Sequence, residues 1–208
     1  MKKSIFKEGK KYTFSDYFEM NNPTEEIVGE FGYSFSYEVI SLPQSSDYNM
    51  TDIKKLQETY YQFLPKIFFN SEMAKREFLI APILIEVAKN TDSKINVEYA
   101  IEVDDKLSGS LDYLICSNQE LLIIEAKKGD LDKGFNQLSA QLIALDKYED
   151  SDFGHKLYGA ITIGEVWKFA TLNRTEKQIT KDINSYTIPS EVDKVFSILM
   201  GILVSKAH

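Results

Sequence analysis

Two carboxylates and one lysine occupy positions in or at the end of apolar stretches. Asp112 lies inside "GSLDYLIC", residues 109–116, and Glu125 and Lys127 end "LLIIEAK", residues 121–127. Period-two alternation predicts a strand for each stretch and places Glu125 and Lys127 on one face. An unpartnered buried carboxylate is costly, so these charges indicate a partnered site.

The two stretches are separated by a single polar break, "SNQE", residues 117–120. A hairpin centred between Asn118 and Gln119 would place Asp112 directly opposite Glu125. Two carboxylates facing each other across a sheet repel. A shared proton, the ammonium of Lys127 or a divalent cation would offset that repulsion.

The third option, a divalent cation, has a specific chemistry. Carboxylates together with a main-chain carbonyl beside Glu125 suit a hard cation such as Mg²⁺ or Mn²⁺. Lys127 would orient or deprotonate a metal-bound water, or stabilise charge developing on a phosphate. The plain alternative is an ion pair at a strand end, which contributes little.

The elements that would position these residues follow from the rest of the pattern. We expect one domain, residues 1–208, with an N-terminal strand-bearing arm over 1–50 and a core over 51–208. The arm carries one alternating strand, "FGYSFSYEV". The core is expected to contain, in order, helices over 51–65 and 71–89, strands over 95–103, 109–116 and 121–127, a helix over 131–148, a hairpin over 158–172 and a helix over 189–206. This order predicts an α/β protein with a mixed central sheet flanked by helices.

Details within these elements carry their own expectations. Phe78, Leu79, Ile83 and Val87 form one apolar stripe on the 71–89 helix, which Pro82 would kink or shorten. Gly164-Glu165 suits a two-residue turn. Ser190 and Asp193 form a capping-box pattern. Trp167 and Phe169 are expected in the core, and Glu98 and Glu102 as charges that protect an edge strand.

Composition limits the classes of function. The net charge is −8, whereas nucleic-acid binders usually show a basic excess, so DNA binding would need a local basic patch or a bound cation. The single Cys116 excludes an internal disulfide framework, and no apolar run reaches the length of a membrane span. No signal peptide is visible at the start, so we expect a cytoplasmic protein.

The pattern "GSLDYLI…LLIIEAKK" resembles the PD-(D/E)xK nuclease superfamily, which has the restriction-endonuclease-like fold. Its Asp and Glu-x-Lys positions correspond to Asp112, Glu125 and Lys127, with Gly109 in the Gly-x-x-Asp form; Leu111 replaces the proline that often precedes the Asp. The resemblance covers residues 71–172, and its hairpin is similar to that of type I restriction subunits. The whole chain also resembles a family of cyanobacterial proteins built on this fold, from which no function carries over.

The resemblance implies further site residues. Many members carry a glutamine on the helix after the Glu-x-Lys strand, here Gln137 or Gln141. Many also carry a glutamate on the helix before the sheet. Glu77 is the best match for that position, and Glu72 and Glu86 are its rivals.

The implied function is a Mg²⁺- or Mn²⁺-dependent nuclease that acts on DNA. Asp112 and Glu125 would hold the metal with Glu77 completing the site, while Lys127 and Gln137 would act in catalysis. Two alternatives stay open. In the first, the chain would be a catalytically inactive binding or scaffold protein that keeps the fold. In the second, it would be a nuclease subunit that needs a homodimer or a partner for DNA recognition, since no helix-turn-helix or zinc finger is visible.

Overall fold

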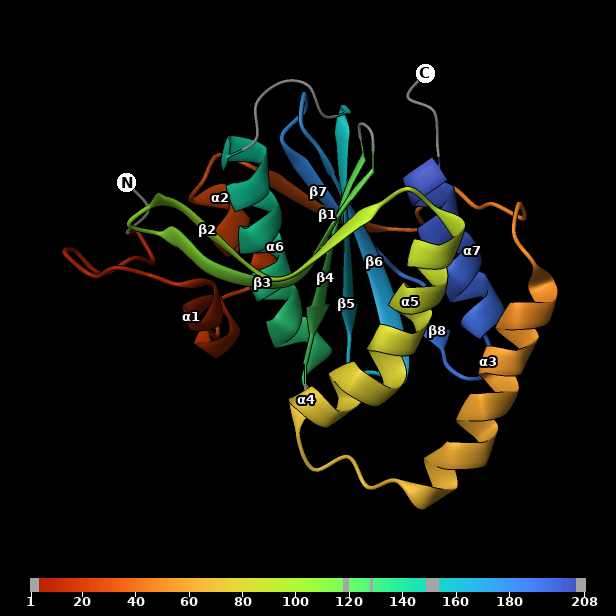
Figure 1. Ribbon diagram of the computed structural model, residues 1–208. Helices are drawn as coiled ribbons and strands as arrows, with labels where there is room; N and C mark the ends of the chain where they lie inside the picture. The colour runs from red at the N-terminus through yellow and green to blue at the C-terminus, as the bar shows by residue number, and fades with distance from the viewer. Residues whose placement is uncertain (1–3, 118–119, 128, 149–153, 205–208) are drawn as a thin grey trace.

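The computed structural model describes residues 4–117, 120–127, 129–148 and 154–204. Within them, eight strands form one open mixed sheet with helices on both faces, which confirms the predicted α/β class (Figure 1). The strands are β1 (Ser34–Glu38), β2 (Lys94–Asp104), β3 (Leu107–Ser117), β4 (Glu120–Ala126), β5 (Lys156–Thr162), β6 (Val166–Asn173), β7 (Gln178–Asp182) and β8 (Tyr186–Thr187). Their order across the sheet is β1-β7-β6-β5-β4-β3-β2, with β8 beside β6.

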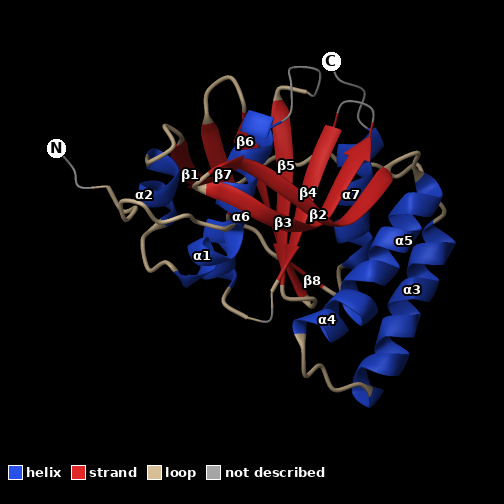
Figure 2. Ribbon diagram, turned by 60° about the vertical axis from the view of Figure 1, so that its left-hand side comes forward, coloured by secondary structure: helices blue, strands red, loops and turns tan. Residues whose placement is uncertain are grey.

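The helices divide between the two faces of the sheet. They are α1 (Phe14–Glu19), α2 (Thr24–Gly29), α3 (Met50–Phe63), α4 (Glu72–Lys75), α5 (Ala81–Asn90), α6 (Leu131–Tyr148) and α7 (Val192–Val204). Figure 2 shows α1, α2 and α6 on one side of the sheet and α3, α5 and α7 on the other. Each side has its own buried apolar cluster, so the sheet lies between two cores.

Several expected core positions are confirmed. Trp167 and Phe169 are fully buried. The apolar side of α7 is buried as well, so it serves the core. No helix in the described part of the chain is long and apolar enough to cross a membrane.

The β3–β4 hairpin has the predicted register. Tyr113 pairs with Ile124, and the pairing continues to Ser117 and Glu120 at the turn. Asp112 and Glu125 are the next residues beyond the last pair, so they are cross-strand neighbours at the open end of the hairpin. On its other side, β4 runs parallel to β5, with Glu125 paired to Ile161.

Asp130 caps the start of α6, the helix that follows β4. The carboxylate of Asp130 accepts a hydrogen bond from the backbone N–H of Lys133, which satisfies a first-turn donor of α6. The bounds of α6 match the predicted 131–148. This fixes the face of α6 that meets the sheet at the end of β4.

The helix predicted over 71–89 has an irregular centre. A π-helical turn (Arg76–Ile80) joins α4 to α5 and ends two residues before Pro82. A proline inside a helix has no N–H to donate and crowds the preceding turn, which accounts for the local widening. Leu79, Ile83 and Val87 are buried as expected, but Phe78 is 43% exposed, so the prediction for Phe78 was wrong.

The N-terminal arm is packed into the core. β1 extends the sheet edge in parallel with β7, while α1 packs on α6 and β3. Gly109 has a φ of +136°, and a Cβ there would lie 2.9 Å from the Phe14 ring, so this glycine admits α1 against β3. Periodicity did not predict α1, α2, β7 or β8, which are short.

The C-terminal turns are partly as expected. β5 and β6 meet at a two-residue turn of Gly164 and Glu165. The Ser190–Asp193 capping box was wrong. Ser190 contacts Thr187 instead, and the carboxylate of Glu191 accepts a hydrogen bond from the Thr187 backbone N–H.

Candidate active site

Glu125 is the centre of a buried polar cluster at the end of β4. The residue is only 1% exposed. Gln137 Nε2 donates to its Oε1 at 2.6 Å, and Gln141 Nε2 donates to its Oε2 at 2.6 Å. The two glutamines lie one turn apart on α6, so both reach the same carboxylate. The structure therefore brings Gln137 and Gln141 to the predicted site.

Lys127 is the first residue after β4, and its side chain contacts the same carboxylate. Its Nζ lies 2.6 Å from Glu125 Oε1, and its side chain is 13% exposed. The predicted common face of Glu125 and Lys127 is therefore confirmed. Phe18 of α1 lies 5.4 Å from the ammonium, and a Cβ on Gly134 would lie 3.0 Å from Lys127 Cγ, so α1 and α6 both close around this lysine.

Asp112 lies between two other carboxylates. Val97 pairs with Tyr113 and Tyr99 with Leu111, so the register places Glu98 opposite Asp112 on β2. Glu125 lies on the other side of Asp112, on β4. Asp112 also has a cationic partner, since Arg76 Nη1 lies 3.4 Å from its Oδ1. Asp112 is thus one of three acidic residues in a row across the sheet, with Arg76 beside two of them.

Burial and charge change the acidity of Glu125. Burial, and then the nearby charge of Asp112, raise the pKa of the Glu125 carboxyl to about 7, against the opposing effect of Lys127 and Gln141. A group near neutrality in a polar cluster is a common feature of functional sites. Each glutamine amide can turn its N–H₂ to the ionised carboxylate or its oxygen to the protonated carboxyl.

This raised pKa predicts a pH-dependent stability. Between its ordinary value near 4.5 and about 7, Glu125 keeps its proton in the folded chain and loses it in the unfolded chain. Its contribution to the free energy of unfolding must therefore fall as pH rises through that window. Glu125→Gln has no carboxyl to titrate at this position. The free energy of unfolding of the variant, relative to wild type, should therefore increase by about 1–3 kcal/mol as pH rises from 4.5 to 7.5. Urea denaturation at several pH values measures the difference, and a pH-independent difference would contradict the raised pKa.

The residues fit a metal held by two carboxylates. Asp112 and Glu125 supply the anionic oxygens, and Mg²⁺ is often bound through one or two carboxylates with water and phosphate completing its shell. The side-chain oxygens Gln137 Oε1 and Gln141 Oε1 are buried without a hydrogen-bond partner in the described part of the chain, so further oxygen donors are present. Each carboxylate also has a cationic neighbour, Lys127 beside Glu125 and Arg76 beside Asp112.

The predicted third carboxylate is not part of this group. Among the described residues, no three histidine, cysteine, aspartate or glutamate side chains lie close enough together to hold a metal ion. Glu77 is exposed in the π-helical turn, so its assignment as a metal ligand needs correction. Its rival Glu86 pairs with Lys89. The helix before the sheet brings a cation to Asp112, because the widened turn directs Arg76 there.

Sequence reasoning missed Arg76 and Phe18. Arg76 precedes Leu79, Ile83 and Val87 by three, seven and eleven residues, so it continues their buried stripe by one turn. A cationic residue at the helical spacing of a buried apolar stripe was the signal from which Arg76 could have been predicted. Phe18 had no comparable signal, because it reaches Lys127 through the packing of α1 on α6.

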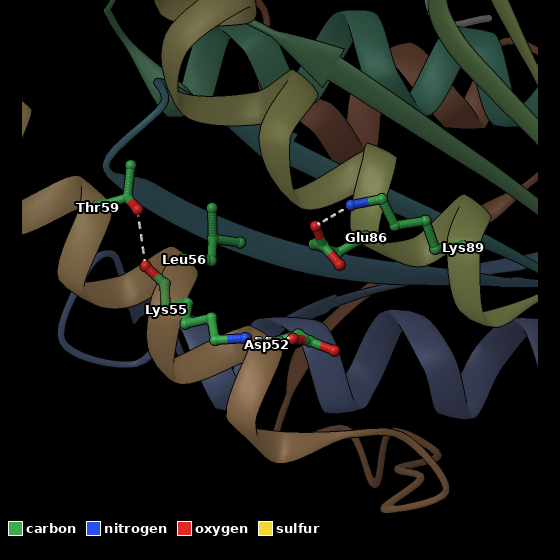
Figure 3. Close-up of a pocket in the computed structure, with 6 residues that line it drawn as sticks. All are labelled: Asp52, Lys55, Leu56, Thr59, Glu86 and Lys89. Atoms are coloured by element: carbon green, nitrogen blue, oxygen red, sulfur yellow. Dashed lines mark hydrogen bonds and ion pairs between the residues drawn. The ribbon is translucent and has the colours of Figure 1, made fainter.

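A separate hollow lies between α3 and α5, away from these residues. Its volume is about 400 Å³, and Figure 3 shows charged side chains at its mouth. Lys55 pairs with Asp52 and Lys89 with Glu86, two exposed lysines with two partly buried carboxylates. These ion pairs account for the charges, so the hollow does not compete with the Glu125 cluster as a reactive site.

Comparisons with known proteins add no family. No protein-family model matches the chain, and no curated protein matches it either. The chemistry of the cluster is therefore inferred from its own geometry.

Proposed function

We propose that the protein is a metal-dependent nuclease that hydrolyses phosphodiester bonds in DNA, with Mg²⁺ or Mn²⁺ as cofactor. The observation that carries the proposal is the Glu125 carboxylate. It is buried at the end of β4 beside a second carboxylate and has a lysine Nζ at 2.6 Å. A strand-end pair of carboxylates with a lysine is also the pattern by which the chain resembles the PD-(D/E)xK superfamily.

The roles follow from position. Asp112 and Glu125 would hold the ion, which when bound polarises the scissile phosphate and lowers the pKa of the attacking water. Lys127, largely shielded from solvent, stabilises negative charge that develops on the phosphate. Gln137 and Gln141 fix both oxygens of Glu125, so its orientation does not depend on the ion.

Local charge supports a polyanionic substrate despite the net charge of −8. Glu125 pairs with Ile161, and Ile161 with Lys168, so Lys168 lies in the same row two strands away, roughly 10 Å across the sheet. Lys168 and Lys181 both lie over the Tyr37 ring, at 5.9 and 5.5 Å. Lys168 gives a phosphate backbone a positive contact beside the candidate site, whereas Lys181 is buried and paired with Asp132 at 2.6 Å.

Metal binding and cleavage test the proposal together. Wild type should bind Mn²⁺ and Mg²⁺ in calorimetric titrations, and should cut single- or double-stranded DNA only with the metal present. Asp112→Ala should lose both properties, because it removes one of two metal-binding carboxylates. Absence of metal binding, with cleavage no higher than that of Asp112→Ala, would contradict the nuclease proposal.

A second candidate has its own supporting observation. Both oxygens of Glu125 accept hydrogen bonds from glutamine amides, and Asp112 faces Arg76, so each carboxylate has partners within the protein itself. This favours an inactive binding or scaffold protein, or a subunit whose site opens with a second copy or a partner. DNA binding without cleavage would support it. A cytoplasmic location, suggested by the lone Cys116, is part of either proposal.

A further inference from the structure

Arg76 is a partly buried cation beside the candidate site, with no role in the chemistry so far. It is the first residue of the π-helical turn, and its side chain is 15% exposed. Single π-helical turns inside α-helices are frequent at functional sites. Here the turn directs Arg76 to Asp112 and leaves Glu77 in solvent.

The contacts of Arg76 with Glu98, Asp112 and Tyr113 fix the orientation of its guanidinium. One nitrogen, Nη1, lies 3.3 Å from Glu98 Oε1 and 3.4 Å from Asp112 Oδ1. The guanidinium carbon lies 5.2 Å from the centre of the Tyr113 ring. The Tyr113 side chain also takes part in a hydrogen bond with Arg76. Two carboxylates and one aromatic side chain therefore hold the planar guanidinium in place beside Asp112.

Glu98 holds Arg76 from a strained backbone position. It is a non-glycine residue with a φ of +55° in the middle of β2. This left-handed conformation costs about 1–2 kcal/mol for an L-residue. Such strain tends to persist at sites where it serves a function. The residue lies opposite Asp112, and its side chain meets Arg76.

A phosphodiester at this site needs a cation on the Asp112 side. Asp112 and Glu125 both repel a phosphate, and Lys127 is already engaged by Glu125 on the other side. A guanidinium is planar, always charged and well matched to phosphate oxygens. Arg76 stands beside Asp112 with this chemistry in a fixed orientation.

We propose that Arg76 binds a non-bridging phosphate oxygen of the nucleic-acid backbone next to the scissile phosphodiester, anchored by Glu98 and Asp112. This rests on the proposed nuclease function and adds a second substrate-binding cation to it. Lys127 would serve the phosphate on the Glu125 side, and Arg76 on the Asp112 side.

Steady-state cleavage of a duplex oligonucleotide, with Arg76→Gln and Arg76→Lys, tests the role. Arg76→Gln should raise KM by about 10- to 100-fold, the range for one hydrogen bond to a charged group. Arg76→Lys keeps the positive charge but loses the planar guanidinium, so its KM should lie between those of wild type and Arg76→Gln. Glu98→Gln should shift KM in the same direction by less. Lys89→Gln removes a charge from the exposed face of the same helix and should leave KM unchanged.

Separate outcomes identify which proposal fails. Wild-type cleavage with an unchanged KM in Arg76→Gln would overturn the role of Arg76 alone, and a lower Tm with unchanged KM would assign Arg76 to structure and overturn it as well. Calorimetry with Mn²⁺ should show that Arg76→Gln binds metal at least as tightly as wild type, because it removes a neighbouring cation; lost metal binding would also count against the proposal. If wild type shows neither metal binding nor cleavage, the nuclease proposal fails, and the proposed role of Arg76 fails with it.

Discussion

Lys127→Met should lower metal-dependent DNA cleavage by about 10²- to 10³-fold, the range for losing one preorganised charge-stabilising donor. Methionine keeps the length of the lysine stem but removes the Nζ that lies 2.6 Å from Glu125 Oε1. Single-turnover cleavage with saturating Mn²⁺ measures the loss. Binding of the oligonucleotide should fall much less, because the principal effect is on the developing charge of the transition state.

The same substitution should also weaken metal binding at neutral pH. Lys127 lowers the pKa of Glu125, so its removal raises that pKa further above the ordinary value. More of the carboxyl is then protonated at pH 7 and cannot hold a cation. Mn²⁺ affinity of Lys127→Met should therefore recover as pH rises, which calorimetry at several pH values from neutral to alkaline measures.

Lys156→Met is the matched control for this prediction. Lys156 is exposed at the start of β5, and Thr162 at the opposite end of that strand lies beside Lys127. Losing this charge should leave cleavage and metal affinity within about twofold of wild type. Lys156 lies at the end of β5 away from the site, and solvent screens its charge. Equal cleavage by Lys127→Met and wild type would contradict the role of Lys127.

Gly201→Ala should destabilise the fold by about 1–3 kcal/mol or more, as overpacking of a core contact does. A Cβ at Gly201 of α7 would lie 2.5 Å from three backbone atoms of Pro43 and Gln44. Backbone cannot turn aside as a side chain does, so α7 and the 43–44 segment must separate. The expected fall in Tm is roughly 2–12 °C, measurable by thermal denaturation.

Gly29→Ala supplies the contrast. Gly29 ends α2, and a Cβ there would meet no atom within 4 Å. Alanine in an open helical position normally stabilises by up to about 1 kcal/mol, so this variant should match or exceed wild type. Similar effects of the two substitutions would contradict the close approach at Gly201. Mn²⁺ binding by folded Gly201→Ala should persist, because α7 covers the face of the sheet opposite α6.

The parts predicted well share a local cause. Period-two alternation and a single polar break fixed the β3–β4 register, and with it the pairing of Asp112 and Glu125. The 3.6-residue period predicted α6 over 131–148, and the resemblance implied that this helix carries a site glutamine, Gln137 or Gln141. In each case one short segment contains the signal, so no distant contact is needed to predict the structure.

The parts that were missed depend on distant contacts. The helix before the sheet brings Arg76 to Asp112, while the expected Glu77 lies exposed in the π-helical turn. β1 lies within the strand expected in the arm, but its parallel pairing with β7 forms only because segments far apart in the chain meet. The pattern of β7 itself is too brief to distinguish a strand from a loop.

The sequence alone determined which residue types meet at the end of β4, because alternation and hairpin register are local properties of the chain. Only the tertiary structure decided what surrounds them. Phe18 lies near Lys127, and Arg76 faces Asp112 and Glu98, because α1 packs on α6 and a π-helical turn redirects one side chain. The electrostatic environment of the two carboxylates depends on these long-range packing contacts. The local pattern could place Arg76 on the buried side of its helix, but not predict which carboxylates it would meet.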